Sequence, residues 1–172
     1  MSDVVWALDG RLLDALSELG AQIERVEAGA YVVTLPGHRR RSTLAWLIAG
    51  EHAVAVEAFV MHVVDVDDPR LLHRHVLGRN LRRRTVHYAI DDVGDLFLVG
   101  SLPHSACDAA GIDRVLGEVL QALEDDQDSL LALAYGGRLD GNPSLASKVL
   151  ADGAGRRPAG TPLWAPHRDV RR

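Results

Sequence analysis

One histidine, one cysteine and one aspartate stand close together at a point where they could do chemistry. His104, Cys107 and Asp108 precede a segment with helical periodicity. A thiolate at a helix N-terminus is activated by the helix dipole, and a nearby histidine could serve as its base. Nucleophile, base and orienting group normally come from separated segments of a chain. We therefore interpret Asp108 as a helix cap and Cys107 as a small apolar filler.

The eight histidines raise the question of a metal site. His73 and His75 are two residues apart on a predicted helix, so they lie about 200° apart around its axis and cannot share one ion. His62 and His87 lie on predicted strands and could approach each other within a sheet. Cysteine or acidic ligands at paired spacing are missing, so the sequence predicts no metal and no cofactor.

Carboxylates occur in two places that call for an interpretation. The segment Asp65-Val66-Asp67-Asp68 lacks the glycine and the distant glutamate of a calcium loop, so we interpret it as a solvated turn before a helix. Glu57 stands among apolar strand residues and is either solvent-facing or buried with an arginine partner. Alternation along the strand favours the solvent-facing position.

Arginines form the densest positive patch, at Arg79, Arg82, Arg83 and Arg84, and residues 39–41 form a second one. Such patches can contact an acidic partner segment or RNA. Neither is interleaved with stacking aromatics and the net charge is −5, which disfavours nucleic acid as a partner. A solvated helix face with i to i+4 pairs is the simplest interpretation, and the first patch is the candidate partner-binding surface.

Composition predicts one domain with an appendage. Of the 172 residues 47% are hydrophobic, enough for a core over residues 1–137, whereas residues 138–172 are rich in glycine, proline and arginine and are predicted to be a mobile tail. The single cysteine has no partner within the chain, which indicates either a reducing compartment or a protein indifferent to redox conditions. Residues 53–64 form the longest apolar stretch, far short of the about 20 residues that span a membrane, and no export signal is visible. We expect a soluble, cytoplasmic protein.

Hydrophobic periodicity predicts the order of the elements. A stripe from Val5 to Leu19 indicates a helix that ends at Gly20, and a short strand at 23–26 is an optional addition. The ranges predicted next are strands at 31–35, 44–49 and 53–63, a helix from Pro69 to about Arg82, strands at 86–90 and 96–100, and a helix that starts after Asp108. The acidic run 124–128 predicts a bend or a break in this last helix, which should end at Gly136-Gly137.

This order predicts a two-layer α+β fold, in which an antiparallel sheet of about five strands packs one face on the first and last helices. The middle helix should lie beside them or at an edge of the sheet. The predicted order is α-β-β-β-α-β-β-α, with the optional extra strand after the first helix.

Several phrases of the sequence resemble the YbjN family of bacterial proteins. They are residues 31–37 (YVVTLPG), 56–60 (VEAFV), 77–81 (LGRNL), 98–103 (LVGSLP) and the hairpin from Tyr88 to Asp95. The resemblance implies a fold similar to type III secretion chaperones, small acidic and usually dimeric proteins that hold a partner chain in an extended form. The family is described as sensory-transduction regulators and supplies no catalytic residues.

The resemblance therefore implies a non-enzymatic, chaperone-like or regulatory adaptor that binds a protein or peptide, with homodimerisation as an option. The alternative is an enzyme or small-molecule sensor whose pocket the sequence does not reveal. A deep polar cleft around Glu57, His62, His87 or Cys107 would favour that alternative.

Overall fold

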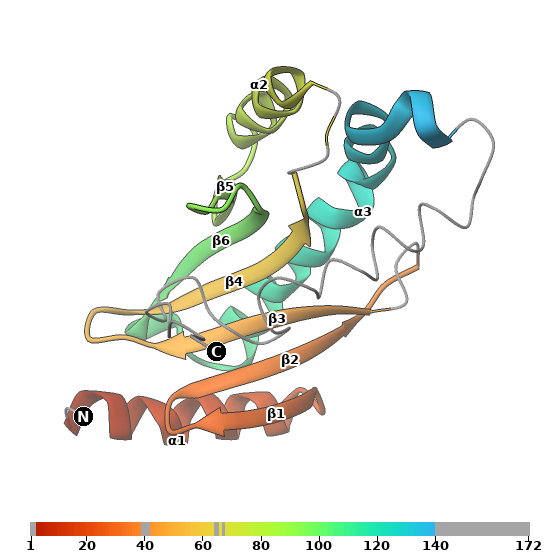
Figure 1. Ribbon diagram of the computed structural model, residues 1–172. Coiled ribbons are helices and arrows are strands. Elements are labelled where there is room, and N and C mark those ends of the chain that lie inside the picture. The colour runs from red at the N-terminus through yellow and green to blue at the C-terminus, as the bar shows by residue number, and fades with distance from the viewer. Residues whose placement is uncertain (1–2, 39–41, 64–65, 67, 140–172) are drawn as a thin grey trace, which may run out of the picture.

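The computed structural model describes residues 3–38, 42–63, 66 and 68–139, and its elements follow the predicted order (Figure 1). They are α1 (Asp3–Glu18), β1 (Gln22–Glu27), β2 (Ala30–Pro36), β3 (Ser42–Ala49), β4 (Ala53–Met61), α2 (Pro69–Asn80), β5 (Val86–Ile90), β6 (Leu96–Pro103), the 3-10 turn η1 (His104–Ala106) and α3 (Ala109–Leu139). The predicted boundary at 137 and the tail beyond it remain predictions, since the residues after Leu139 lie outside the described part of the chain.

All six strands form one antiparallel sheet in the order β1-β2-β3-β4-β6-β5. The first four strands are a meander, and β6 pairs with β4 so that β5 becomes an edge strand. The α+β class and the order of the elements along the chain are confirmed, and the optional strand after the first helix exists as β1, which makes six strands in place of about five. Gly20 allows the turn into β1, because its φ of 62° is a conformation that glycine adopts without strain.

The strand register defines the two faces of the sheet. Residues paired directly across strands share a face, and successive residues alternate between faces. One row runs through Ile23, Val33, Ala45, Ala58, Leu98 and Tyr88, and the adjacent row on the other face runs through Glu24, Val32, Trp46, Glu57, Val99 and His87. We call the first the helix face and the second the open face.

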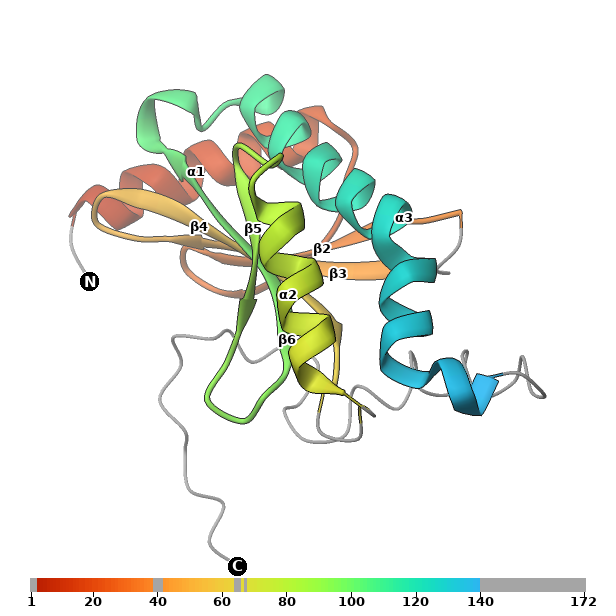
Figure 2. The same cartoon turned by 90° about the horizontal axis from the view of Figure 1, so that it is seen from above.

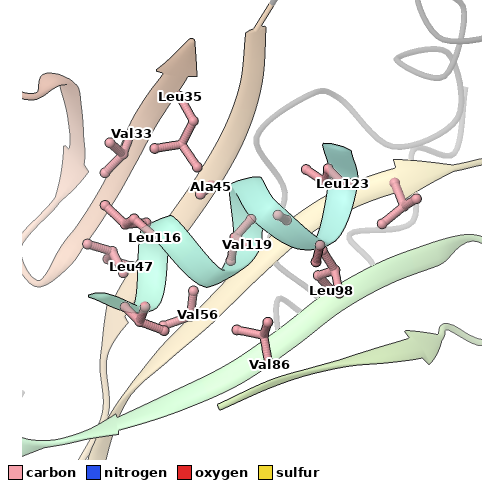
Figure 3. Packing of buried hydrophobic residues seen from close by; sticks show 14 of the residues in the cluster. Val33, Leu35, Ala45, Leu47, Val56, Val86, Leu98, Leu116, Val119 and Leu123 are labelled. Carbon is pink, nitrogen blue, oxygen red and sulfur yellow. The ribbon is translucent and has the colours of Figure 1, made fainter. Parts of the chain in front are cut away.

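Helices α1 and α3 lie on the helix face, whereas α2 lies near β5 at the end of the sheet (Figure 2). The buried core joins side chains of both helices to the strands, with Leu116 and Val119 of α3 above Leu47 and Val56 (Figure 3). Leu12 of α1 belongs to the same cluster and is fully buried. The prediction that the first and last helices cover the sheet is confirmed.

Two aspartates cap helices as the sequence predicts. The Asp68 carboxylate accepts a hydrogen bond from the Arg70 backbone N–H at 3.0 Å, with Pro69 in the first turn of α2. Asp108 accepts one from the Gly111 N–H at 2.8 Å and begins α3. Both caps satisfy N–H groups that a helix end would otherwise leave without a partner.

The sequence left either a bend or a break open at 124–128, and the structure excludes the break. Helix α3 continues through this segment, and the non-helical backbone lies at Tyr135, with φ −140° and ψ 17°. The middle carboxylate of the run, Asp126, is buried and paired with arginine. A negative charge in an apolar stripe thus marked a packed ion pair.

Replacing Leu12 with Ala should destabilise the fold by about 2–5 kcal/mol, because it leaves a cavity in the closed core between α1 and the sheet. The neighbouring Leu13 is 39% exposed, so Leu13→Ala should cost about 1 kcal/mol or less. Urea unfolding of both variants measures the difference in the free energy of unfolding. Equal losses would contradict the packing of α1 described here.

Candidate functional site

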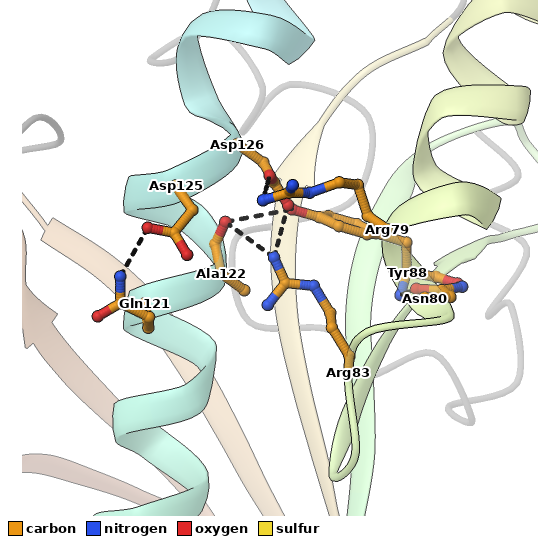
Figure 4. Close-up of polar contacts among 8 residues, drawn as sticks. All are labelled: Arg79, Asn80, Arg83, Tyr88, Gln121, Ala122, Asp125 and Asp126. Carbon is orange, nitrogen blue, oxygen red and sulfur yellow. Dashed lines mark hydrogen bonds and ion pairs between the residues drawn. The ribbon is translucent and has the colours of Figure 1, made fainter.

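The arginines of the predicted patch surround a buried carboxylate on α3. Asp126 is 1% exposed and forms ion pairs with Arg79 of α2 and with Arg83, the latter at 2.5 Å (Figure 4). The Tyr88 hydroxyl of β5 donates a hydrogen bond to the same carboxylate at 2.8 Å. The Arg83 guanidinium also stacks over the Tyr88 ring, 5.4 Å from its centroid. We call these four residues the Asp126 cluster.

The segment between α2 and β5 is fixed by further polar contacts. The Asn80 side chain accepts from the Tyr88 N–H at 2.7 Å and donates to the Tyr88 carbonyl at 3.1 Å. The Thr85 hydroxyl donates to Glu118 of α3 at 2.8 Å. Polar contacts therefore connect the end of α2 and the start of β5 to α3.

Burial and hydrogen bonding have opposite effects on the pKa of the Asp126 carboxyl. Burial alone would raise the pKa of the Asp126 carboxyl, but the hydrogen bonds from Arg79, Tyr88 and Arg83 outweigh it and hold this pKa below the ordinary value of 3.8. Burial and the neighbouring carboxylate raise the pKa of the Tyr88 hydroxyl. The cluster is therefore an ionised carboxylate with cationic and neutral donors.

The four predicted site arginines have different surroundings. Arg79 and Arg83 are paired with Asp126, while Arg82 and Arg84 are exposed. Arg84 lines a hollow of about 570 Å³ formed by residues of β5 and β6. Arg82 lines a different hollow, the one along α2. Within the predicted patch, Arg82 and Arg84 present their charges to solvent, and their role in partner binding remains a prediction.

Arg79 and Arg82 border a groove of about 540 Å³ along α2. Its lining also includes Leu71, Arg74, His75, Gly78 and, from α3, Leu133. Three leucines on and just after α2 are exposed, by 52% at Leu71, 65% at Leu77 and 89% at Leu81. We call this groove and these leucines the α2 surface. It combines apolar side chains with positive charge, which suits a partner segment that is both apolar and acidic.

The cysteine cluster has the structural role that the sequence indicated. Cys107 is 2% exposed, and burial raises the pKa of its thiol, which disfavours the nucleophilic thiolate. A ring nitrogen of His104 contacts the Gly50 carbonyl at 3.0 Å. Asp108 caps α3 as described above. The Cys107 thiol is thus a buried side chain at the base of α3.

The remaining histidines and acidic residues do not assemble a metal centre in the described part of the chain. Nowhere in it do three or more histidine, cysteine, aspartate or glutamate side chains lie where they could hold an ion. His62 lies 2.5 Å from Asp95, with its ring edge against Phe59. Asp65 and Asp67 of the predicted acidic turn lie outside the described residues.

The expectation that Glu57 faces solvent is wrong. Alternation correctly places Glu57 opposite the helix-face residues Val56 and Ala58, but the side chain is only 8% exposed. Its cross-strand neighbours on the open face are Trp46 and Val99. The open face is thus itself largely buried at this position, and alternation assigns a face without assigning its exposure.

Sequence reasoning missed the buried aspartates of the two helices that cover the sheet, Asp9 of α1 and Asp126 of α3. Asp9 on α1 accepts hydrogen bonds from the Tyr31 hydroxyl at 2.6 Å and the Gly29 N–H at 2.7 Å, and pairs with Arg25 at 2.5 Å. Burial would raise the pKa of Asp9, but these donors lower it below 3.8. A signal existed for both, since Asp9 stands three residues before Leu12 and Asp126 three residues after Leu123, within the apolar stripes.

The chain belongs to the YbjN family, described as "Putative bacterial sensory transduction regulator", with residues 9–132 matching. It is 47% identical over 104 residues to the uncharacterized protein ML2442 of Mycobacterium leprae, a match that covers 60% of this chain and 56% of that one. It is 43% identical over 106 residues to the uncharacterized protein Rv0487 of Mycobacterium tuberculosis, covering 62% and 57%. The match thus spans little more than half the length of these relatives.

Solved structures of similar fold include type III secretion chaperones. A chain of the ExsC–ExsE complex matches with a TM-score of 0.55 and 14% identity, over 75% of this chain and 97% of that one. The HopA1–SchA chaperone–effector complex gives 0.55 and 14%, over 74% and 99%. The Yersinia pestis chaperone SycH, in complex with a fragment of YscM2, gives 0.50 and 20%, over 72% and 98%. At these identities the likeness shows the fold.

None of the described helices is long and apolar enough to cross a membrane.

Asp126→Asn should destabilise the protein by about 2–4 kcal/mol, because it leaves Arg83 and Arg79 without their carboxylate; Arg79 is partly exposed, which reduces the loss. The neighbouring Asp125 is exposed, and Asp125→Asn is the matched control with the same change of charge. Urea unfolding measures both. A loss of similar size in the control would show that net charge, and not the cluster, is responsible.

Stability should also fall in acid. The pKa values of Asp126 and Asp9 are lower in the folded protein than in the unfolded chain, where they take the ordinary 3.8. Their stabilisation is complete above that value and is lost as the pH falls through the folded-state pKa values. The free energy of unfolding, measured from neutral pH to about pH 2, should decline less steeply in Asp126→Asn than in the wild type. Identical slopes would contradict the proposed charge state.

Proposed function

We propose that this protein is a non-enzymatic, cytoplasmic adaptor that binds a protein or peptide partner in a chaperone-like manner. The single observation that carries the proposal is the groove along α2, where the exposed Leu71 lies beside Arg74 and Arg82, while Leu77 and Leu81 add exposed apolar area outside the groove lining. Exposed apolar side chains rimmed by charge are typical of interaction surfaces.

The geometry of the groove indicates the chemistry of the partner. Arg74 and Arg82 line it together with Leu71, so a helix or extended segment that carries leucine-like and carboxylate side chains would fit.

Structural relatives support a protein partner. The similar folds described above were solved as complexes, including a chaperone with an effector and SycH with a fragment of YscM2. These partners are those of the related proteins. The shared fold is the only reason to infer a polypeptide partner for the present chain. The family description as a sensory transduction regulator is compatible with an adaptor.

Two other functions, homodimerisation and small-molecule sensing, predict different observations. A homodimer through α2 would bury Leu77 and Leu81 against their copies, and the solution mass would be twice that of the chain. A small-molecule sensor would bind its ligand in one of the hollows of about 450–570 Å³ found on the described residues.

The double substitution Arg74→Glu/Arg82→Glu should reduce partner capture several-fold. Both side chains line the groove and neither is part of the Asp126 cluster, so the fold should be unaffected. Tagged protein is crosslinked in cells of its own bacterium and recovered, and the captured proteins are quantified by mass spectrometry. The captured segment should be acidic and apolar.

A control with the same change of charge is Arg70→Glu/Arg114→Glu, since both arginines are exposed and lie outside the groove. It should capture partner as the wild type does. A reproducible small molecule in the purified protein, without a protein partner, would refute the adaptor proposal. A stable dimer that the groove substitutions split into monomers would assign the α2 surface to self-association.

A further inference from the structure

A glycine stands inside α2, where neither backbone geometry nor packing requires one. Gly78 is exposed and helical, and the positive φ values of the described residues occur elsewhere, at Gly20, Gly29 and Gly94. A Cβ atom added at Gly78 would meet no atom of the described residues within 4 Å. Glycine is the poorest helix former after proline, so this position weakens α2 with no gain to the fold. What Gly78 does is to line the groove along α2.

The groove residues on and after α2 have the spacing of the holes that receive a second helix. In such packing a side chain of one helix inserts between four residues of the other, at positions i, i+3, i+4 and i+7. Two sets with this spacing line the groove, and they are Leu71, Arg74, His75 and Gly78, then His75, Gly78, Arg79 and Arg82. Arg82 follows the end of α2, but its N–H continues the turn by donating to the Arg79 carbonyl at 3.0 Å. Gly78 belongs to both sets, so its missing side chain deepens both holes.

We propose that the groove binds an α-helix of a partner protein, which crosses α2 at Gly78, and that this glycine determines which helices fit. The proposed adaptor function is assumed here, and the form of the bound segment is what is added to it. Two apolar side chains of the partner helix, three or four residues apart, enter the two holes. Leu71 and Leu133 give them apolar contacts at the walls of the groove.

The lining of the groove favours a helix over an extended segment. It comes from α2, from the turn that follows α2 and from Leu133 of α3, and it includes no residue of the sheet. An extended segment would therefore find no strand edge to pair with its N–H and C=O groups. A helix satisfies these groups within itself and needs only side-chain contacts from the groove.

Charge favours a different protein over a second copy of this chain. The lining holds Arg74, Arg79 and Arg82, and no acidic side chain of the described residues belongs to it. Arg79 is paired with Asp126, so Arg74 and Arg82 are the cations that face a bound helix. Helix α2 contains no aspartate or glutamate, so a second α2 would bring arginines against arginines. A partner helix that carries carboxylates beside its apolar residues meets the opposite charge.

A side chain at position 78 would obstruct the partner helix without harming the fold. Packed helices have axes roughly 8–10 Å apart, at a distance set by the side chains at the contact, and glycine allows the closest approach. Leucine at this position would fill both holes and hold the partner away. It would also stabilise α2, because leucine is a better helix former than glycine. Binding and stability should therefore change in opposite directions, which a purely structural role of Gly78 would not produce.

The test compares Gly78→Ala and Gly78→Leu with the wild type, in the full chain and in the crosslinking assay described above. Gly117→Leu is the matched control, because Gly117 lies within α3, is exposed, has open space at its Cβ position and is not part of the groove. We expect Gly78→Leu to lower capture of the partner several-fold, Gly78→Ala to lower it less and Gly117→Leu to leave it unchanged. The unfolding midpoint should rise in both leucine variants.

The form of the bound segment is measured on a synthetic peptide that spans the crosslinked site of the captured protein. Its sequence should carry apolar residues three or four positions apart beside carboxylates. Circular dichroism should show a gain of helix when the peptide binds the wild type, and its dissociation constant should rise several-fold with Gly78→Leu. A peptide that binds without gaining helix, or that binds Gly78→Leu as tightly as the wild type, would overturn the proposal.

Failure of the helix at Gly78 is distinguishable from failure of the adaptor function. If Arg74→Glu/Arg82→Glu abolishes capture while Gly78→Leu leaves it unchanged, the groove binds a partner in another way and only the helix is refuted. If the wild type itself captures no protein, the adaptor function fails and the helix fails with it. A wild-type dimer that Gly78→Leu dissociates in sedimentation measurements would identify a second copy as the occupant and would also refute the partner helix.

Discussion

Burial of the apolar helix face beneath α1 and α3 is the interaction on which the rest of the structure depends. The side chains at its centre, among them Leu47, Val56 and Leu98, are excluded from water, and α3 supplies the opposing layer through Leu116 and Val119. Strand alternation then fixes every other position, because a residue that points away from this layer must lie on the open face. The position of Trp46, Glu57 and Phe97 is a consequence of that single choice.

Two buried aspartates, Asp9 and Asp126, fix the orientation of α1 and α3 on the sheet, which apolar burial alone does not define. Hydrophobic contact is non-directional, so it holds a helix against a sheet without fixing its rotation or slide. Asp9 joins α1 to Tyr31 and to the turn at Gly29, and Asp126 joins α3 to Arg83 and to Tyr88. Each carboxylate accepts from a tyrosine hydroxyl and an arginine, which is the satisfied state that a buried charge requires. The two helices are thereby held in a defined orientation on the sheet.

Sequence patterns predicted the elements because those depend on local periodicity, and they failed where distant residues meet. The alternation at Val54, Val56 and Ala58 located the helix face of β4, and the capping pattern at Asp68-Pro69 located the start of α2. Glu57 lies between Trp46 and Val99, which distant strands bring beside it, and the role of Asp126 depends on Arg83, 43 positions away. A periodicity argument contains no such contacts. Periodicity therefore predicted a solvent-exposed side chain at Glu57 and a bend or a break in the helix around Asp126.

The candidate site arises from the way α2 is attached. In this helix, Leu72 and Val76 are the buried residues, and its end is held by Arg79 through Asp126 and by Asn80 through Tyr88. Because polar contacts fix the orientation of α2, its other apolar residues are not needed for the core. Leu71 and Leu77 remain exposed to water, so the free energy that their burial would contribute is not gained by folding. A binding partner that buries these leucines would gain that free energy, which is the physical reason to place recognition on the α2 surface.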